Sequence, residues 1–278
     1  MKKYIDLHTH STASDGSFTP TEVVKAAKDA GLSAIALTDH DTIDGLAEAT
    51  EAGRKYGIEV ITGIEFSVTT DTAMHLLGLD FDPDSPAVRG VLDGLVESRD
   101  SRNLEVINKL QLLGLDITYD DMMEFATSRV VGKSQIARAM IKKGYCTTIN
   151  EAFTKYLGKN APAYAKRNSL SPEKAIEIIK KSGGFTSLAH LNQTKKSDEE
   201  LYVLLKGLKA AGLDAVEGYY TEYTDDMNVR YRAIAAELGL KLTGGSDFHG
   251  ANKDGYEIGT GKGNLRIPYE LLENIRKG

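Results

Sequence analysis

Short apolar runs and longer amphipathic runs alternate over most of the chain. In the first third, this alternation predicts strands and helices at residues 2–10, 19–31, 32–40, 44–57, 59–68 and 73–81. In the last third, it predicts them at residues 171–184, 185–191, 198–212, 215–220, 226–239 and 241–249. The first helix has clear boundaries, because Thr19 can cap it, Pro20 suits its first turn and Gly31 ends it. A strand followed by a helix and a second strand is typical of parallel sheets, so the pattern predicts an α/β fold.

The alternation stops between residues 84 and 168. The pattern there is helical, with one long and three short segments at residues 87–114, 120–128, 133–144 and 150–158. No part of this stretch reads as a strand, and we interpret it as a helical insertion. An α/β body of residues 1–83 and 169–278, with a cap of residues 84–168, is the organisation expected of a barrel-type enzyme with a lid.

All six histidines lie on, or at the end of, a predicted strand. His8 and His10 share one face of the first strand, because side chains on a strand alternate with period two. Asp247 and His249 repeat that spacing on the last strand. One histidine at a strand end is more often a hydrogen-bonded structural residue than a ligand. Six of six indicate a functional cluster, because barrel enzymes place their chemistry at the C-terminal ends of the strands.

A metal cluster would explain why so many imidazoles and carboxylates gather. Without a cation, their burial would carry a large cost in desolvation and repulsion. Histidine and carboxylate ligands without a thiolate suit zinc, manganese or iron. Nine ligands are too many for one tetrahedral ion and match two or three ions completed by water. The candidate ligands are His8, His10, Asp15, His40, Glu65, His75, His190, Asp247 and His249.

Three further acidic residues lie close to these positions, and we interpret them as structural. Asp39 and Asp41 flank His40 and are expected to form local caps and to orient the histidine. Asp6 lies on the same face of the first strand as His8 and His10. It is deeper in the strand, where a buried structural carboxylate is expected.

Six short segments, taken in order, resemble the motifs of the polymerase and histidinol phosphatase (PHP) family. They read "DLHTHSTASDG", "LTDHDTIDG", "GIEFS", "HLLG", "LAH" and "GGSDFHG". The stretch "EAFTKYLGKNAPAYAKR" is similar to a branch that includes nucleoside 3′,5′-bisphosphate phosphatases and a 5′-to-3′ exoribonuclease. The resemblance spans nearly the whole chain. It implies a distorted (β/α)7 barrel of the PHP type with an inserted helical cap and three divalent ions.

The resemblance also implies how the ligands would be shared. The first ion would be held by His8, His10, Glu65 and Asp247, the second by Glu65 as a bridge with His75 and His190, and the third by Asp15, His40 and His249. Asp15 stands where some relatives have histidine. A carboxylate hardens the site, which favours manganese or iron over zinc.

The chain departs from the family pattern at two places. Relatives often read "AHP" where it reads "AHLNQ", a change that keeps His190 but affects the following loop. Relatives also read "GRPH" where it reads "GKSQ", so that Lys133 replaces an arginine and would bind phosphate as a point charge. The basic residues of the insertion are either solvated surface charges or ligands of a non-reacting phosphate. Lys133 and Arg167 are favoured as ligands over Arg129, Arg138 and Lys166.

Such a cluster favours hydrolysis of a phosphate ester, through a hydroxide that bridges the metals and is held by them with Glu65. No protein nucleophile is expected, because there is no G-x-S-x-G motif and no histidine is near Cys146 in the sequence. The predicted substrates are nucleotides or short oligonucleotide ends. The alternatives are a histidinol-phosphate phosphatase and a non-catalytic metal-binding module. The complete ligand set argues against the second.

Composition and charge limit the remaining possibilities. The formal net charge of −6 at pH 7 argues against a protein that binds duplex nucleic acid through its phosphates. No apolar stretch approaches the roughly 18 residues of a membrane helix, and the start lacks the pattern of a signal peptide. We therefore expect a cytoplasmic protein without membrane contact. Its expected partner is a small phosphorylated substrate or a short RNA end, and no obligate protein partner is inferred.

Overall fold

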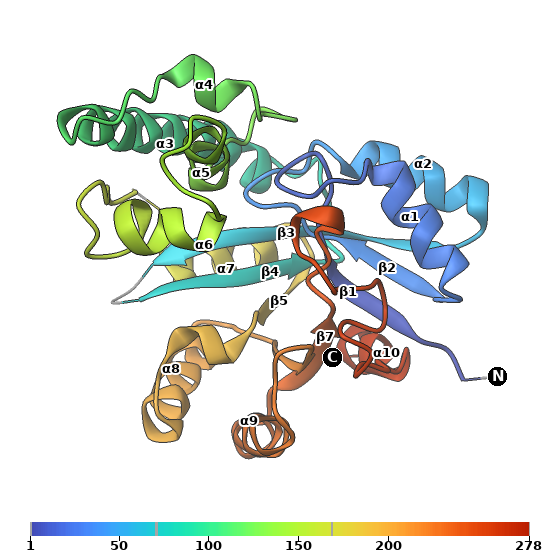
Figure 1. The fold of residues 1–278 in the computed structure, drawn as a ribbon. Coiled ribbons are helices and arrows are strands. Elements are labelled where there is room, and N and C mark those ends of the chain that lie inside the picture. The colour runs from blue at the N-terminus through green and yellow to red at the C-terminus, as the bar shows by residue number, and fades with distance from the viewer. Residues whose placement is uncertain (1, 70–71, 168, 278) are drawn as a thin grey trace. The chain divides into compact units, whose positions relative to one another are not determined.

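The computed structural model describes residues 2–69, 72–167 and 169–277, and the chain divides into two compact units. The first unit comprises residues 1–90 and 170–278, and the second comprises residues 91–169. Figure 1 shows the sheet within the first unit and the helices of both.

A seven-stranded sheet forms the centre of the first unit. Its strands lie in the order of the sequence: β1 (Ile5–Thr9), β2 (Ala34–Leu37), β3 (Glu59–Thr69), β4 (Ala73–Leu79), β5 (Phe185–Leu188), β6 (Ala215–Tyr220) and β7 (Lys241–Gly245). The segment after β7 returns to β1, because the Asp247 amide donates to the His8 carbonyl at 2.9 Å and the His10 amide to the Phe248 carbonyl at 2.8 Å. The sheet is therefore a nearly closed barrel, and the predicted α/β barrel is confirmed.

Strand β4 runs antiparallel to both of its neighbours, whereas the other neighbouring strands are parallel. The chain passes from Thr69 to Ala73 without the dozen or more residues that a parallel crossover needs. Consequently His75, near the start of β4, pairs in register with Ser67, near the end of β3. The first residues of β4 thus lie at the edge where the parallel strands end.

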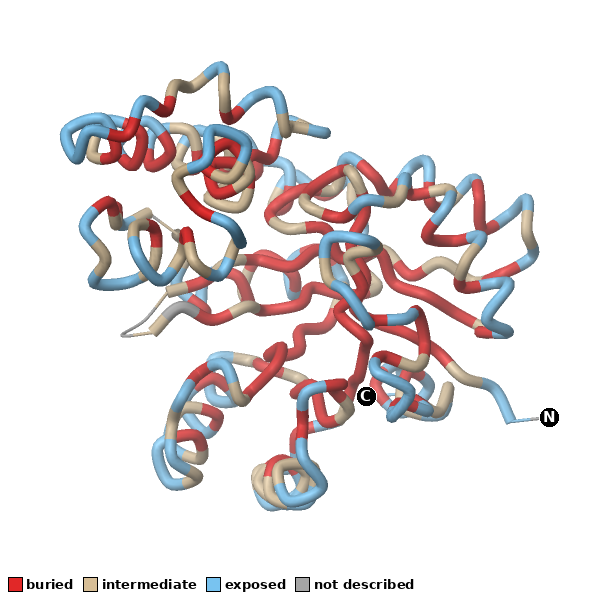
Figure 2. Tube along the Cα trace, in the orientation of Figure 1, coloured by how far each residue is buried: buried red, intermediate tan, exposed pale blue. Residues whose placement is uncertain are grey.

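The helices of the first unit match the predicted amphipathic runs. They are α1 (Pro20–Asp29), α2 (Leu46–Tyr56), α7 (Pro172–Lys181), α8 (Asp198–Ala210) and α9 (Asp225–Leu238). Thr19 caps α1 in a capping box with Glu22, and Pro20 is its first residue, as predicted. Figure 2 shows the strands of this unit buried and the outer faces of its helices exposed.

Three short elements lie outside the predicted set. They are the 3₁₀ turns η2 (Leu191–Thr194) and η3 (Gly250–Asn252) and the C-terminal helix α10 (Glu270–Arg276). Leu272 and Ile275 of α10 pack in one core cluster with Ile5 and Leu7 of β1. The two 3₁₀ turns follow β5 and β7 directly, so both shape the edge of the barrel where the histidines lie.

Within its described residues, the second unit consists of helices joined by turns and loops. It contains most of α3 (Pro86–Leu112), together with α4 (Tyr119–Met123), α5 (Lys133–Lys142), α6 (Ile149–Ala152) and the π-helical turn η1 (Phe153–Leu157). It has a core of its own, which includes Val106, Leu110, Ile136, Met140 and Leu157. Within the described residues of the chain, none of the helices is long and apolar enough to cross a membrane.

Candidate metal centre

The nine predicted ligands lie together at the edge of the barrel where the parallel strands end. Their ring and carboxylate atoms form four overlapping groups, in each of which the atoms lie within 4.8 Å of one another. The groups are His8, His10 and Glu65; His8, His190 and Asp247; His40, Glu65 and His75; and His10, Asp15, His40 and His249. The last of these contains the three residues assigned above to a third ion, with His10 in addition.

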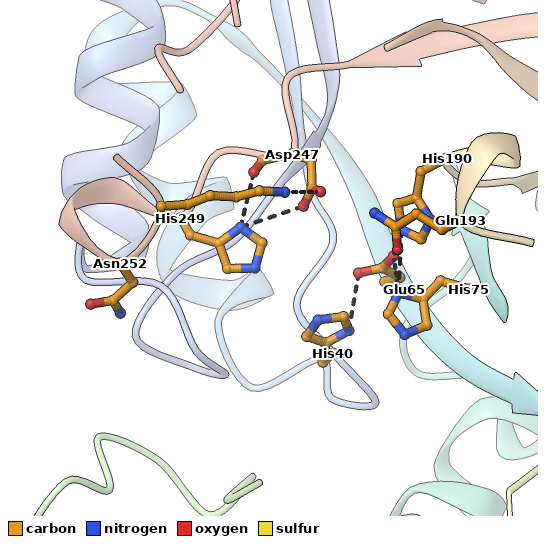
Figure 3. A pocket seen from close by; sticks show the side chains of 9 residues that line it. His40, Glu65, His75, His190, Gln193, Asp247, His249 and Asn252 are labelled. Carbon is orange, nitrogen blue, oxygen red and sulfur yellow. Dashed lines mark hydrogen bonds and ion pairs between the residues drawn. The ribbon is translucent and has the colours of Figure 1, made fainter. Parts of the chain in front are cut away.

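Glu65, on β3, lies at the centre of the cluster, and both of its oxygens face histidines. Oε1 lies 2.9 Å from His75 Nδ1 and 3.1 Å from His190 Nε2. Oε2 lies 3.0 Å from His40 Nδ1 and 3.2 Å from His10 Nε2. Figure 3 shows His40, His75 and His190 turned toward this carboxylate. A carboxylate in this position can contact more than one ion.

The donor set fits a group of cations. Among the described residues, five buried atoms of the cluster lack a hydrogen bond of good geometry: His8 Nε2, both ring nitrogens of His10, His40 Nδ1 and Glu65 Oε2. Unpaired polar atoms are expensive to bury. Divalent ions among them would remove that cost, because each of these atoms can act as a metal ligand.

The pKa values reflect the crowding of charge. Burial raises the pKa of Glu65, but the surrounding histidines, with His75 and His40 first, together lower it more, so that it lies well below its usual range. Burial lowers the pKa of His10, yet the neighbouring carboxylates of Asp247 and Glu65 raise it to about 10. For His40, burial dominates and the pKa is lowered. The pKa of His8 is raised as well, so in the metal-free chain protons on His8 and His10 balance carboxylates where metal ions otherwise would.

Two of the nine residues have an unusual backbone. His190 has φ 27° and Asp247 has φ 57°, and neither is a glycine. Such conformations cost free energy and persist only where the surrounding structure enforces them. The carboxylate of Glu217 binds the backbone of His190, since its Oε2 accepts the His190 amide at 2.6 Å.

Glu217 contacts two of the candidate ligands and is not among the residues predicted from the sequence. It lies on β6 and is fully buried, and its Oε1 is 3.0 Å from His8 Nδ1. This contact turns His8 Nε2 toward the cluster and fixes which ring nitrogen carries the proton. An acidic residue inside the apolar strand "AVEGYY" was the available signal.

The acidic residues interpreted as structural hold the backbone around the ligands. Asp39 accepts hydrogen bonds from the amide and hydroxyl of Ser11 at 2.8 and 2.7 Å. Asp6 is fully buried and accepts the backbone amides of Ser246 and Gly259 at 2.9 and 2.7 Å. Asp41 accepts the amide of Ser67 at 2.9 Å. Asp6 is thus the buried structural carboxylate that was predicted, whereas these contacts of Asp39 and Asp41 join distant segments and are not the expected local caps.

A cavity of about 250 Å³ opens over the cluster. Six of its lining residues are candidate ligands, and the other three are Gln193, Asn252 and Lys253. Gln193 belongs to η2, the turn that replaces the expected "AHP" sequence. His75 and Asp15 have the most exposed side chains of the candidate ligands, at 29% and 28%.

The predicted substrate-binding residues lie in the second unit, where Lys133 and Arg129 have partners. Lys133 donates to the Leu157 carbonyl at 2.8 Å and lies over the rings of Phe153 and Tyr164. Burial and the charge of Arg102 lower its pKa to about 8. The remaining predicted residues are Arg129, which pairs with Asp93 at 3.1 Å, Arg138 of α5, and Lys166 and Arg167 near the end of the unit.

Residues 6–225 match the family model of the PHP domain. The chain is 35% identical to a 5′-3′ exoribonuclease of Haemophilus influenzae, over 90% of this chain and 91% of the relative. It is 32% identical to a 3′,5′-nucleoside bisphosphate phosphatase of Chromobacterium violaceum, over 92% and 90%. An amidohydrolase structure from the same organism, with bound sulfate and no metal, superposes with a TM-score of 0.88 at 29% identity, covering 99% of this chain and 96% of that one.

The chain therefore belongs to the PHP domain family, and the family expected from the motifs is confirmed. Its fold, its ligand groups and its relatives make it a metal-dependent phosphoesterase, and hence a hydrolase.

Proposed function

We propose that the protein hydrolyses phosphate esters of nucleotides or of short oligonucleotide ends, with two or three divalent ions held by the nine candidate ligands. The observation that carries the proposal is the convergence of six histidines and three carboxylates below one cavity. Manganese, iron and zinc all suit this donor set, and the aspartate at position 15 favours the first two.

The chain's own residues would organise such a site around Glu65. Its two oxygens face opposite groups of histidines, so it is the candidate bridge between ions. Divalent ions in such a site polarise phosphoryl oxygens and stabilise the charge that develops in the transition state. Glu217 would keep His8 in the orientation in which Nε2 faces the cluster.

Two relatives support nucleotides as the substrate class. One is named as acting on nucleoside 3′,5′-bisphosphates and the other on RNA from its 5′ end. Both substrates carry a second phosphate, on the same nucleotide or on the next one in the chain. We propose that basic residues of the second unit, with Lys133 and Arg167 first, bind this non-reacting phosphate and help to orient the reacting one.

Substitution of these two residues separates substrate recognition from the chemical step. Lys133→Met, which keeps the packing on Phe153 and Tyr164, and Arg167→Ala should lower turnover of a nucleoside 3′,5′-bisphosphate by one to two orders of magnitude, since each charge-assisted contact is worth ~1.5–3 kcal/mol. A small aryl phosphate should be hydrolysed at the wild-type rate. Equal losses on both substrates would mean that the residues support the fold.

Product release by the Mn²⁺-loaded protein tests the proposed reaction, measured as phosphate from the phosphomonoesters, mononucleotide from the RNA and arylamine from the amide. The panel comprises an aryl phosphate, a nucleoside 3′,5′-bisphosphate, a short 5′-phosphorylated RNA, histidinol phosphate and an aryl amide. We expect the nucleotide or the RNA to be the best substrate. Hydrolysis of the amide alone would overturn the assignment, and preference for histidinol phosphate would favour the alternative phosphatase.

A further inference from the structure

Lys253 is the one lysine or arginine among the described residues that line the cavity. It follows η3 and lies four residues after His249. Its side chain is 27% exposed. The cavity is therefore lined by both the cluster and one ammonium group beside it.

The surroundings of Lys253 hold its side chain in place. Its Nζ donates to Asp247 Oδ2 at 2.5 Å and lies 3.4 Å from the Tyr220 hydroxyl. The ammonium also lies 4.3 Å from the centre of the Tyr256 ring. A cation fixed by a carboxylate and an aromatic face loses little freedom when it binds an anion.

The two oxygens of Asp247 have different neighbours. Oδ1 faces the histidines, at 3.5 Å from His10 Nε2 and 3.4 Å from His249 Nδ1. Oδ2 accepts from Lys253 and from the hydroxyl of Tyr220 at 3.0 Å. An ion held by Oδ1 would leave the contact between Oδ2 and Lys253 intact. The ammonium can therefore stay beside the cluster when the site is loaded.

An ammonium group has three N–H donors. Asp247 takes one donor of Lys253, and the Tyr220 hydroxyl lies within weak hydrogen-bond distance of a second. The exposed part of the side chain faces the cavity, where a further acceptor can bind. A phosphoryl group next to the ions supplies such an acceptor in its non-bridging oxygens, and the charge-assisted contact would be strong.

We propose that Lys253 binds a non-bridging oxygen of the phosphoryl group at the cluster. The inference rests on the proposed function and assigns the recognition of the reacting phosphate to a residue of the barrel. It differs from the role of Lys133 and Arg167, which would contact a second, non-reacting phosphate. Gln193 also lines the cavity, and its amide lies 3.4 Å from the same Tyr220 hydroxyl that neighbours Lys253.

Binding of inorganic phosphate to the Mn²⁺-loaded protein tests this role. Lys253→Met keeps the length of the side chain and its packing on Tyr256 but removes the charge, and Lys253→Arg keeps the charge. The matched control is Lys262→Met, because Lys262 lies over the same ring at 4.7 Å but does not line the cavity. Calorimetry gives the phosphate affinity at saturating Mn²⁺, and elemental analysis gives the ions per chain.

We expect Lys253→Met to bind phosphate roughly 10- to 100-fold more weakly, with the ion content unchanged. Lys253→Arg and Lys262→Met should stay within about threefold of the wild type. An unchanged affinity in Lys253→Met would overturn the proposal. A loss of ions that excess Mn²⁺ does not restore would overturn it as well, because Lys253 would then act through Asp247.

Phosphate affinity, taken together with hydrolysis of the substrate panel, separates this proposal from the proposed function. A wild-type protein that binds phosphate but hydrolyses no phosphate ester would contradict the function, while a weaker affinity in Lys253→Met would still support the contact. A wild-type protein that hydrolyses phosphate esters, with equal phosphate affinity in Lys253→Met, would support the function and contradict the contact.

Discussion

At the scale of single residues, Glu65 and Glu217 have different roles although both are buried acids at the same end of the barrel. Glu65 faces five histidines with its two oxygens, and the ions that we propose would lie between them. Glu217 contacts one side of His8 and the backbone of His190, so it acts on the cluster only through these residues. Substitution to glutamine should therefore affect metal binding differently at the two positions.

Glu65→Gln should disturb two ions together, because a neutral amide replaces the charged carboxylate that would contact both, and its nitrogen cannot serve as a ligand. Elemental analysis after reconstitution with Mn²⁺ measures the effect. Glu59→Gln is the control, since Glu59 lies at the other end of the same strand and pairs with Arg276. Loss of a single ion in Glu65→Gln would contradict the bridging role.

Glu217→Gln should weaken the binding of Mn²⁺ by about 10- to 100-fold without removing the site. A glutamine oxygen can accept from His8 or from the His190 amide but not from both, because its other end carries only donors. Competition with a chelator gives the affinity, and the exposed Glu222→Gln on the loop after β6 is the control. Wild-type affinity in Glu217→Gln would show that the orientation of His8 does not depend on this contact.

At the scale of elements, the candidate centre depends on how closely β1 and β7 approach each other. Gly245 ends β7, and a Cβ placed on it would lie 2.2 Å from His8 Cβ and 2.6 Å from the His8 amide nitrogen. These atoms belong to a fully buried residue of the neighbouring strand, so they cannot move aside easily. Glycine at this position allows β1 and β7 to bring His8, His10 and Asp247 together.

Gly245→Ala should lower the free energy of unfolding by about 1–3 kcal/mol, as expected for overpacking of a buried site. Urea denaturation of the metal-free protein measures the change. Gly207→Ala in α8 is the matched control, because a Cβ there meets no atom within 4 Å, and it should raise stability by about 0.5–1 kcal/mol. Equal effects of the two substitutions would show that the close approach at Gly245 is not limiting.

At the scale of the whole molecule, the cluster links stability to pH when the metal is removed. Although burial lowers the pKa of His10, Asp247 and Glu65 raise it from 6.5 to about 10. A group with a higher pKa in the folded state gives its full stabilisation below its unfolded pKa and loses it as the pH rises through the folded value. The carboxylates have lowered pKa values, so their contribution is lost only in acid.

The metal-free protein should therefore unfold at a lower urea concentration at pH 9 than at pH 6.5. The Mn²⁺-loaded protein should show a smaller decrease or none, because metal ions replace the protons on the histidines and bind more tightly as the pH rises. Denaturation curves at both pH values, with and without Mn²⁺, measure the difference. A metal-free midpoint that stays constant or rises would contradict this balance of charges.

The sequence by itself determined the order and type of the main elements and the set of candidate ligands. Local periodicity carries this information: alternation with period two places His8 and His10 on one face of β1, and helical periodicity predicts an insertion over residues 84–168, where the structure has a compact unit of residues 91–169. Motif order was sufficient for the family. These features depend on neighbours in the chain, so they can be read without the fold.

Only the tertiary structure decided how the barrel edge is assembled. The reversed direction of β4, which brings His75 to the cluster, follows from strand pairing and not from the apolar pattern of β4 itself. Glu217 meets His8 across 209 positions of the sequence, and Lys253 meets Tyr220 across 33. Such contacts depend on the register and packing of strands and loops that are distant in the chain. Local periodicity carries no information about register or about packing between distant segments.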